Sequence, residues 1–151
     1  MPIYFSTGGY KNQDTFKVVK DLVSKGVNFI ELSGTSYSAN NIEKLTEFMP
    51  VAKFQIHNYF PPPKIPFVIN LASMNEEIYQ KSIDHIFFAI ENCKKINSTY
   101  YSFHAGFLCD IDVNEIGKRV KKKFLQNRKD SISLFIERLK IVSDKASKYG
   151  I

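Results

Sequence analysis

Short apolar runs and longer stretches of helical periodicity alternate along this chain. Four runs have the length and composition of β-strands: residues 3–6, 28–32, 53–57 and 99–104. After each run, apolar residues recur every three or four positions, as on one face of a helix. These segments are residues 16–23, 40–49, 73–93 and 130–146, the last beginning at about Asp130. Four strand–helix repeats predict an α/β fold built of βαβ units on a parallel sheet.

Local signals mark where the helices begin. Ser73 and Glu76 form an S-x-x-E pattern that predicts a capping box for the long helix, and Asn40 with Glu43 resembles another. On the long helix, His85 is predicted to lie at the surface. The three prolines at 61–63 exclude a helix or a central strand between the third apolar run and this helix.

Alternation within the strands separates an apolar face from a polar one. Apolar positions such as Ile30, Leu32, Phe54 and Ile56 share the parity expected to face the helices. The opposite parity holds polar groups that gather toward the strand ends: Ser6, Glu31, Gln55, His57, Ser102 and His104. Parallel α/β proteins place their functional sites at these carboxyl ends, so the polar face is the candidate site.

His57 and His104 are the last residues of the third and fourth predicted strands, and both point to the polar face. Neighbouring parallel strands lie about 4.8 Å apart, so two such imidazoles can share one divalent ion such as zinc, manganese, iron or cobalt. The alternative is a pair of core histidines bonded to the backbone. Glu31 is the one carboxylate on this face of a predicted strand, which leaves further metal ligands to come from elsewhere.

Two loops have alternative interpretations. Asp110 and Asp112 follow the fourth strand, where they either approach the site or serve as capping and solvated residues. Tyr59, Phe60 and the prolines after them either form an aromatic wall over a substrate or a rigid connection.

Composition fits a folded domain. The chain has 151 residues and 17.4 kDa, with 44% hydrophobic and 24% charged residues, and no stretch approaches the roughly 20 apolar residues of a membrane span. The start of the chain lacks the pattern of a secretory signal, and two cysteines are too few for a disulfide scaffold, so a cytoplasmic protein with no membrane partner is expected.

The net charge of +6 has a local origin. Residues 118–129 carry seven basic residues and no acidic ones, and subtracting these seven leaves −1 for the rest of the chain. This segment is interpreted either as a solvated face or as a contact to a phosphate-bearing ligand or partner.

Several segments together resemble the xylose-isomerase-like TIM-barrel superfamily, which includes sugar phosphate isomerases and epimerases and the endonuclease-IV-type AP endonucleases. They are residues 6–9, 30–34, 57–60, 67–73 and 102–107. The resemblance implies a (β/α)₈ barrel of which residues 1–151 are the N-terminal half, with about four βα units, truncated before strand five. In the endonuclease branch, histidines matching His57 and His104 bind metal. The N-terminal segment and residues 30–34 look more like the isomerase/epimerase branch. The proline-rich insertion departs from the compact form of the endonuclease branch.

The resemblance therefore implies a metal-dependent isomerase or epimerase acting on a sugar or sugar phosphate. His57 and His104 are the expected ligands of a divalent metal (Mn, Zn, Co or Mg), and Glu31, Tyr59 and Asn70 are the expected substrate contacts. The catalytic acid and base are expected in the missing half, so the metal site is incomplete here and the chain by itself is expected to be inactive. The alternatives are an AP endonuclease that binds abasic DNA and a non-catalytic half-barrel that pairs with another copy as a homo-oligomer.

Overall fold

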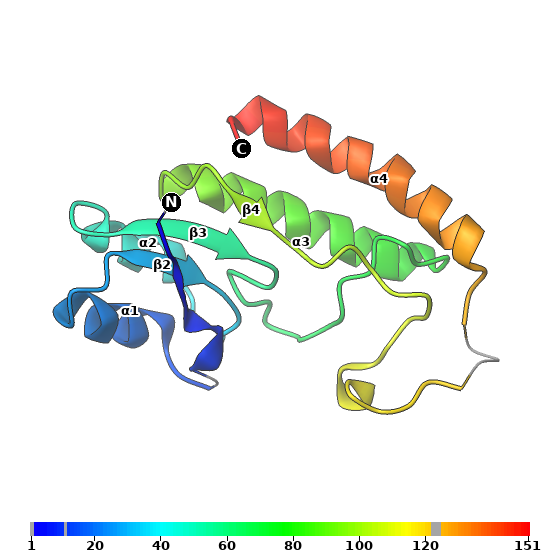
Figure 1. Ribbon diagram of the computed structural model, residues 1–151, viewed down its shortest axis with the longest axis horizontal. Helices are drawn as coiled ribbons and strands as arrows, with labels where there is room; N and C mark the ends of the chain where they lie inside the picture. The colour runs from blue at the N-terminus through cyan, green and yellow to red at the C-terminus, as the bar shows by residue number, and fades with distance from the viewer. Residues whose placement is uncertain (1, 11, 122–124) are drawn as a thin grey trace.

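The computed structural model of the chain describes residues 2–10, 12–121 and 125–151. It is an α/β fold around one parallel sheet in the order β1-β2-β3-β4 (Figure 1). The strands are β1 (Phe5–Ser6), β2 (Phe29–Leu32), β3 (Lys53–His57) and β4 (Tyr101–Ser102). The helices are α1 (Thr15–Ser24), α2 (Asn41–Leu45), α3 (Glu76–Lys95) and α4 (Arg128–Tyr149), with 3₁₀ turns η1 (Thr7–Gly9), η2 (Thr46–Phe48) and η3 (Val113–Glu115). The predicted fold class is confirmed.

The predicted division of the sheet into two faces is also confirmed. Ile30 lies opposite Phe54, and Leu32 opposite Ile56, and all four side chains are buried in one core against α1, α2 and α3. Glu31 lies opposite Gln55, and His57 opposite Ser102; these four are half-buried on the other face. The helices therefore cover one face of the sheet and leave the polar face accessible.

A second core joins α3 to α4. Ile83, Ile86 and Ile90 of α3 are buried with Val142 of α4. In Figure 1 these two helices run side by side, with α3 between the sheet and α4. No helix among the described residues is long and apolar enough to cross a membrane.

Arg138 anchors α4 to the loop that precedes α3. Its side chain is 8% exposed, and Nη1 donates to the carbonyl oxygens of Leu71 at 2.9 Å and Ser73 at 2.6 Å. The guanidinium carbon lies 3.8 Å from the centroid of the Tyr79 ring, in cation–π geometry. The charge is thus satisfied by backbone dipoles, an aromatic face and the carboxylate of Glu76, whose Oε2 lies 3.9 Å from Nη2.

The element ends differ from the predictions. β1 and β4 pair over two residues each, shorter than predicted, because both are outer strands that pair with one neighbour among the described residues. The predicted capping box at Ser73 and Glu76 is wrong. The side chain of Asn75 caps α3 by accepting from the backbone of Glu77, because the Ser73 hydroxyl donates to Asp110.

Two other caps also differ. Asn127 caps α4, so this helix begins at Arg128, two residues before the predicted start. Asn40 does lie at the N-cap of α2, but it makes no side-chain capping bond.

Candidate functional site

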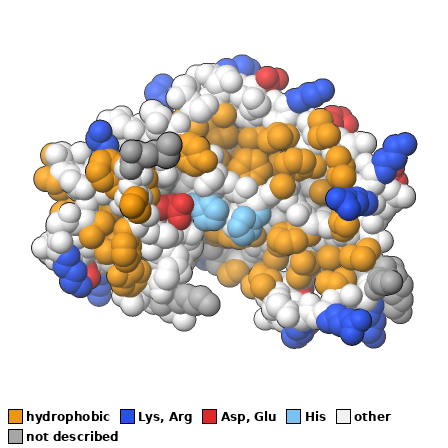
Figure 2. All heavy atoms as spheres, viewed as in Figure 1, with side chains coloured by type: hydrophobic (Ala, Val, Ile, Leu, Met, Phe, Trp, Pro, Cys, Tyr) orange, Lys and Arg blue, Asp and Glu red, His pale blue; other side chains and the backbone are white. Residues whose placement is uncertain are grey.

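The rings of His57 and His104 are neighbours at the carboxyl ends of β3 and β4. Their centroids are 5.5 Å apart and their planes meet at 68°. His57 Nδ1 lies 2.8 Å from Ser102 Oγ, which fixes the orientation of the ring and leaves Nε2 for a ligand. Figure 2 shows two adjacent histidine side chains in the middle of one face, with an acidic side chain beside them and hydrophobic side chains around them. The predicted convergence of these two histidines is therefore found.

Asn58, which the sequence reasoning missed, connects the two strand ends. It is buried in a left-handed conformation with φ 48°, and its N–H donates to the Ser102 carbonyl oxygen at 2.6 Å. Its Oδ1 accepts from the backbone N–H of His104 at 3.4 Å, and its own carbonyl oxygen accepts from the Tyr101 hydroxyl at 3.1 Å. Asparagine tolerates this conformation better than most residues, so an Asn directly after a strand-end histidine is the signal that could have identified it.

Glu31 lies on the same face, one strand away. Because Glu31 pairs with Gln55, it is diagonal to His57, two residues further along β3. Across the described residues, no group of three or more His, Cys, Asp and Glu side chains is placed to hold a metal ion. The two imidazoles therefore fit part of the donor set of a divalent metal, and Glu31 is a neighbour rather than a third ligand.

Tyr59 lies in the loop after β3. Its hydroxyl holds the loop in place, and its ring borders a groove at the surface. Its hydroxyl accepts from the backbone N–H of Ile69 at 2.6 Å, and burial raises the pKa of this phenol. The ring also borders a groove of about 490 Å³ between the proline loop and the loop after β2. Thr35, Ser36, Pro62, Pro63, Lys64 and Phe67 line this groove as well. The two interpretations of the proline loop, a rigid connection and an aromatic wall, are thus compatible, and a contact of Tyr59 with substrate stays a prediction.

Asn70 connects three loop segments. Its Oδ1 accepts from the N–H groups of Ala72 (3.1 Å) and Phe107 (2.9 Å), and its Nδ2 donates to the Cys109 carbonyl (3.3 Å) and to Asp110 Oδ1 (2.9 Å). The side chain is 1% exposed, and all four of its hydrogen-bonding positions are used within the chain. The structure thus gives Asn70 an organising role, and its predicted contact with a substrate hydroxyl stays untested.

Gly106 explains how the loop after β4 approaches Asn70 so closely. Its φ of +142° is unfavourable for other residues, and a Cβ there would lie 2.7 Å from Asn70 Oδ1. A glycine at this position is required by both the backbone conformation and the available space.

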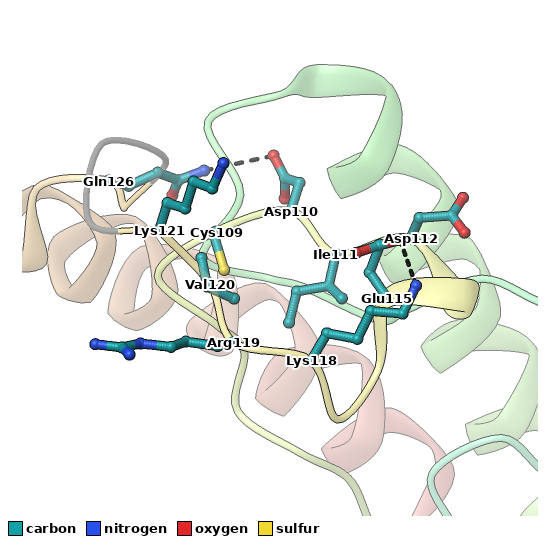
Figure 3. Close-up of a pocket in the computed structure, with 10 residues that line it drawn as sticks. All are labelled: Cys109, Asp110, Ile111, Asp112, Glu115, Lys118, Arg119, Val120, Lys121 and Gln126. Atoms are coloured by element: carbon teal, nitrogen blue, oxygen red, sulfur yellow. Dashed lines mark hydrogen bonds and ion pairs between the residues drawn. The ribbon is translucent and has the colours of Figure 1, made fainter.

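Asp110 and Asp112 are engaged in structural hydrogen bonds. Asp110 Oδ2 accepts from Ser73 Oγ at 2.9 Å and from Gln126 Nε2 at 3.4 Å, and Asp112 caps η3 by accepting from the backbone of Asn114. The capping interpretation is confirmed for Asp112, whereas Asp110 caps no helix among the described residues and instead links distant segments. Figure 3 shows both beside a groove of about 480 Å³ in the loop between β4 and α4.

The described part of the basic segment borders the same groove. Lys118 pairs with Glu115 at 2.8 Å, while Arg119 extends away from the carboxylates (Figure 3). The groove thus combines carboxylates with cations, which reduces the positive potential offered to a phosphate. Residues 122–124 of the basic segment lie outside the described residues.

The prediction that His85 lies at the surface is wrong. It is 8% exposed, with its ring centroid 6.0 Å from that of Tyr59 and 5.8 Å from that of Phe67. The proline loop folds over this part of α3, a long-range contact that helical periodicity does not reveal. Its Nε2 is buried without a hydrogen-bond partner among the described residues.

Burial lowers the pKa of His85, and a hydrogen bond with the backbone of Asn58 opposes this shift in part. Since the folded state holds the ring neutral, the unfolded chain binds more protons below the ordinary pKa of 6.5, and stability falls as pH drops from there toward the folded-state pKa. The slope from one such group is at most about 1.4 kcal/mol per pH unit. We expect this part of the pH dependence, measured by urea unfolding at several pH values, to disappear in His85→Phe. Parallel curves for the two proteins would contradict the assignment.

Comparison with protein families gives one match that covers most of the chain. The sequence profile described as xylose isomerase-like TIM barrel, designated AP endonuclease 2, matches residues 19–151.

Two curated proteins are similar over part of the chain. One is the probable endonuclease 4 of Aquifex aeolicus (strain VF5), 27% identical over 92 residues, which are 61% of this chain and 33% of that protein. The other is the probable endonuclease 4 of Thermotoga neapolitana, 32% identical over 87 residues, or 56% of this chain and 29% of that protein. The aligned part of the chain thus spans about a third of the length of these relatives.

Two solved structures share the fold. The TTHB071 protein from Thermus thermophilus, soaked with ZnCl₂, has a TM-score of 0.63 and 16% identity, and the match covers 100% of this chain and 54% of that one. A D-tagatose 3-epimerase-like protein has a TM-score of 0.61 and 21% identity, with 93% and 49% covered. At these identities the likeness concerns the fold alone.

Proposed function

Because the chain belongs to the xylose isomerase-like TIM-barrel family, we propose that it supplies part of the metal site of an enzyme that isomerises or epimerises a sugar or sugar phosphate. The observation that carries the proposal is the pair of neighbouring imidazoles, His57 and His104, at the carboxyl edge of the sheet. Polar groups at this edge are where a parallel α/β enzyme binds its substrate.

The residues of this chain have distinct roles in the proposal. His57 and His104 hold the metal, and Ser102 keeps His57 in the orientation that leaves Nε2 free. Glu31, diagonal to His57, accepts hydrogen bonds from substrate hydroxyls, and Tyr59 borders the groove beside the proline loop. A divalent ion bound here supplies Lewis-acid polarisation of the carbonyl and hydroxyl oxygens of the sugar. Further ligands and the groups that move the proton come from outside this chain.

The metal site is tested by titrating the purified chain with Zn²⁺ or Co²⁺ in a calorimeter. We expect His57→Ala and His104→Ala each to lower the affinity by at least about tenfold, since each removes one of two imidazole ligands. Ser102→Ala is expected to lower it by about tenfold, because it releases the His57 ring. His85→Phe is the matched control, since it removes a histidine from outside the pair. Equal affinities in all variants would refute the metal site.

The substrate class is tested by ligand-observed NMR with ketoses and ketose phosphates in the presence and absence of Zn²⁺. Binding that requires the metal and is weakened in Glu31→Gln and His57→Ala supports the sugar reaction. Metal binding without any sugar binding would leave the metal site standing and argue against this substrate.

A second candidate is cleavage of abasic DNA, favoured because both curated relatives are probable endonucleases 4. In that case the basic residues between 118 and 129 contact backbone phosphates, and binding of an abasic duplex weakens steeply with salt. The ion pair between Lys118 and Glu115 weakens this interpretation. Tight and salt-dependent binding of an abasic duplex, with no binding of sugars, would favour cleavage of abasic DNA over the sugar reaction.

A further inference from the structure

Tyr101 of β4 lies on the side of the sheet that faces the helices, yet its hydroxyl reaches the loop next to the candidate site. The residue is in register with Ile56, which is buried in the core. Its hydroxyl donates to the carbonyl oxygen of Asn58 at 3.1 Å, one residue beyond the end of β3. A side chain from the core thus bonds to the backbone directly after His57.

The ring of Tyr101 is held in place by its neighbours. It packs against both hydrophobic cores, the one under the sheet and the one between α3 and α4. The ring of Phe103 stacks on it, with centroids 5.5 Å apart and planes that meet at 22°. Because a tyrosine side chain has only two torsions, this packing also determines where the hydroxyl points.

Asn58 depends on hydrogen bonds because of its backbone conformation. Its φ of 48° lies in the left-handed region, which is less favourable for asparagine than for glycine. The residue is 6% exposed, so water replaces a lost hydrogen bond poorly. A residue stays in such a conformation only when the surrounding structure holds it there. Besides accepting from Tyr101, it donates its N–H to the Ser102 carbonyl oxygen and accepts at Oδ1 from the His104 N–H.

The bonds of Asn58 connect it to both imidazoles. One reaches the backbone of His104, and another reaches Ser102, whose Oγ lies 2.8 Å from Nδ1 of His57. A shift of Asn58 therefore moves groups that orient both rings. Without the Tyr101 hydroxyl, the Asn58 carbonyl oxygen loses a donor in a buried place, and the left-handed conformation loses part of its support.

We propose that Tyr101 is a positioning residue, whose hydroxyl holds Asn58 in the conformation that keeps the imidazoles of His57 and His104 oriented for a metal ion. The inference rests on the metal site proposed above and adds to it a residue that does not contact the ion. Partners that orient metal ligands typically change metal affinity by about 10- to 100-fold when they are removed.

The first test needs no metal. Long-range proton–nitrogen NMR spectra of the metal-free chain at about pH 8, above the reference pKa of histidine, report which nitrogen of each imidazole carries the proton. We expect a single tautomer of His57, protonated at Nδ1, since this nitrogen lies beside Ser102 Oγ. In Tyr101→Phe, which keeps the ring and its packing, we expect a mixture with the form protonated at Nε2.

The second test is calorimetric titration with Zn²⁺. We expect Tyr101→Phe to lower the affinity by about tenfold. Tyr100→Phe is the matched control, because it removes the hydroxyl of the preceding tyrosine, which is 53% exposed. Asn92→Ala controls for lost stability, since it removes a buried hydrogen bond within α3. Both controls are expected to bind zinc as tightly as the unaltered chain.

The two readouts separate the positioning role from the metal site itself. If Tyr101→Phe keeps both the His57 tautomer and the zinc affinity, the positioning role is overturned. An equal loss of affinity in Asn92→Ala would also overturn it, because general destabilisation would then be the cause. If the unaltered chain binds no zinc, the metal site fails, and the His57 tautomer in Tyr101→Phe still decides the positioning role.

Asn58→Gly is a second variant, and circular dichroism shows whether each variant folds. Glycine adopts the left-handed conformation readily, so this change keeps the backbone but removes the Oδ1 acceptor of the His104 N–H. We expect a lower zinc affinity here as well. An unchanged affinity would overturn the role of Asn58 as the link between Tyr101 and the two histidines.

Discussion

Asn70→Ala is expected to destabilise the folded chain by about 3–5 kcal/mol, a large effect for a single substitution. The substitution leaves two backbone N–H groups, one carbonyl oxygen and one Asp110 oxygen without the partner that each has now. The site is 1% exposed, so water replaces these bonds poorly. Urea unfolding followed by circular dichroism measures the loss.

Asn92→Ala is the matched control for this change. Asn92 is also a buried asparagine, 2% exposed, but its Nδ2 makes one hydrogen bond, to the carbonyl oxygen of Phe88 on its own helix. A cost of about 1 kcal/mol is expected there. If the two variants lose the same stability, the four hydrogen bonds of Asn70 do not organise the loops around it.

Arg138→Ala is expected to cost about 3 kcal/mol of unfolding free energy. It removes two charge-assisted hydrogen bonds and the contact with the Tyr79 ring, and it leaves the carbonyl oxygens of Leu71 and Ser73 buried without that donor. Chemical denaturation is again the measurement. Arg138→Lys retains the positive charge but not the planar group that stacks on Tyr79, so an intermediate loss is expected.

Arg128→Ala provides the comparison for this second change. Arg128 is the first residue of the same helix and is exposed, so its removal is expected to cost less than about 0.5 kcal/mol. A similar cost for both arginines would show that the buried guanidinium does not hold α4 in place.

The sheet and its two faces were predictable because they depend on local periodicity. The alternation of Phe54, Gln55, Ile56 and His57 within one strand is enough to place the histidine on the polar face. The proximity of His57 to His104 then followed from the pairing of two consecutive parallel strands. Neither inference required knowledge of a loop.

The features that the sequence did not reveal all depend on contacts between distant segments. Ser73 and Glu76 match a capping pattern, but the Ser73 hydroxyl donates to Asp110, which lies 37 residues further along the chain. Asn75 caps the helix instead. His85 lies beside the apolar stripe of α3 and is buried because the proline loop covers it. That loop is held in place by the hydrogen bond from Ile69 to Tyr59, and helical spacing carries no information about it.

The bridge formed by Asn58 bears on the entropy of the metal binding that we propose. Its hydrogen bonds to Ser102 and His104 order the two strand ends before any ligand arrives. An ion that binds between His57 and His104 then acts on a preorganised chelate, so little conformational freedom remains to be lost. Such rigidity also favours ions whose preferred geometry fits the fixed spacing of the two rings. The buried side chain of Asn58 would then influence which metal binds, although it does not contact the ion.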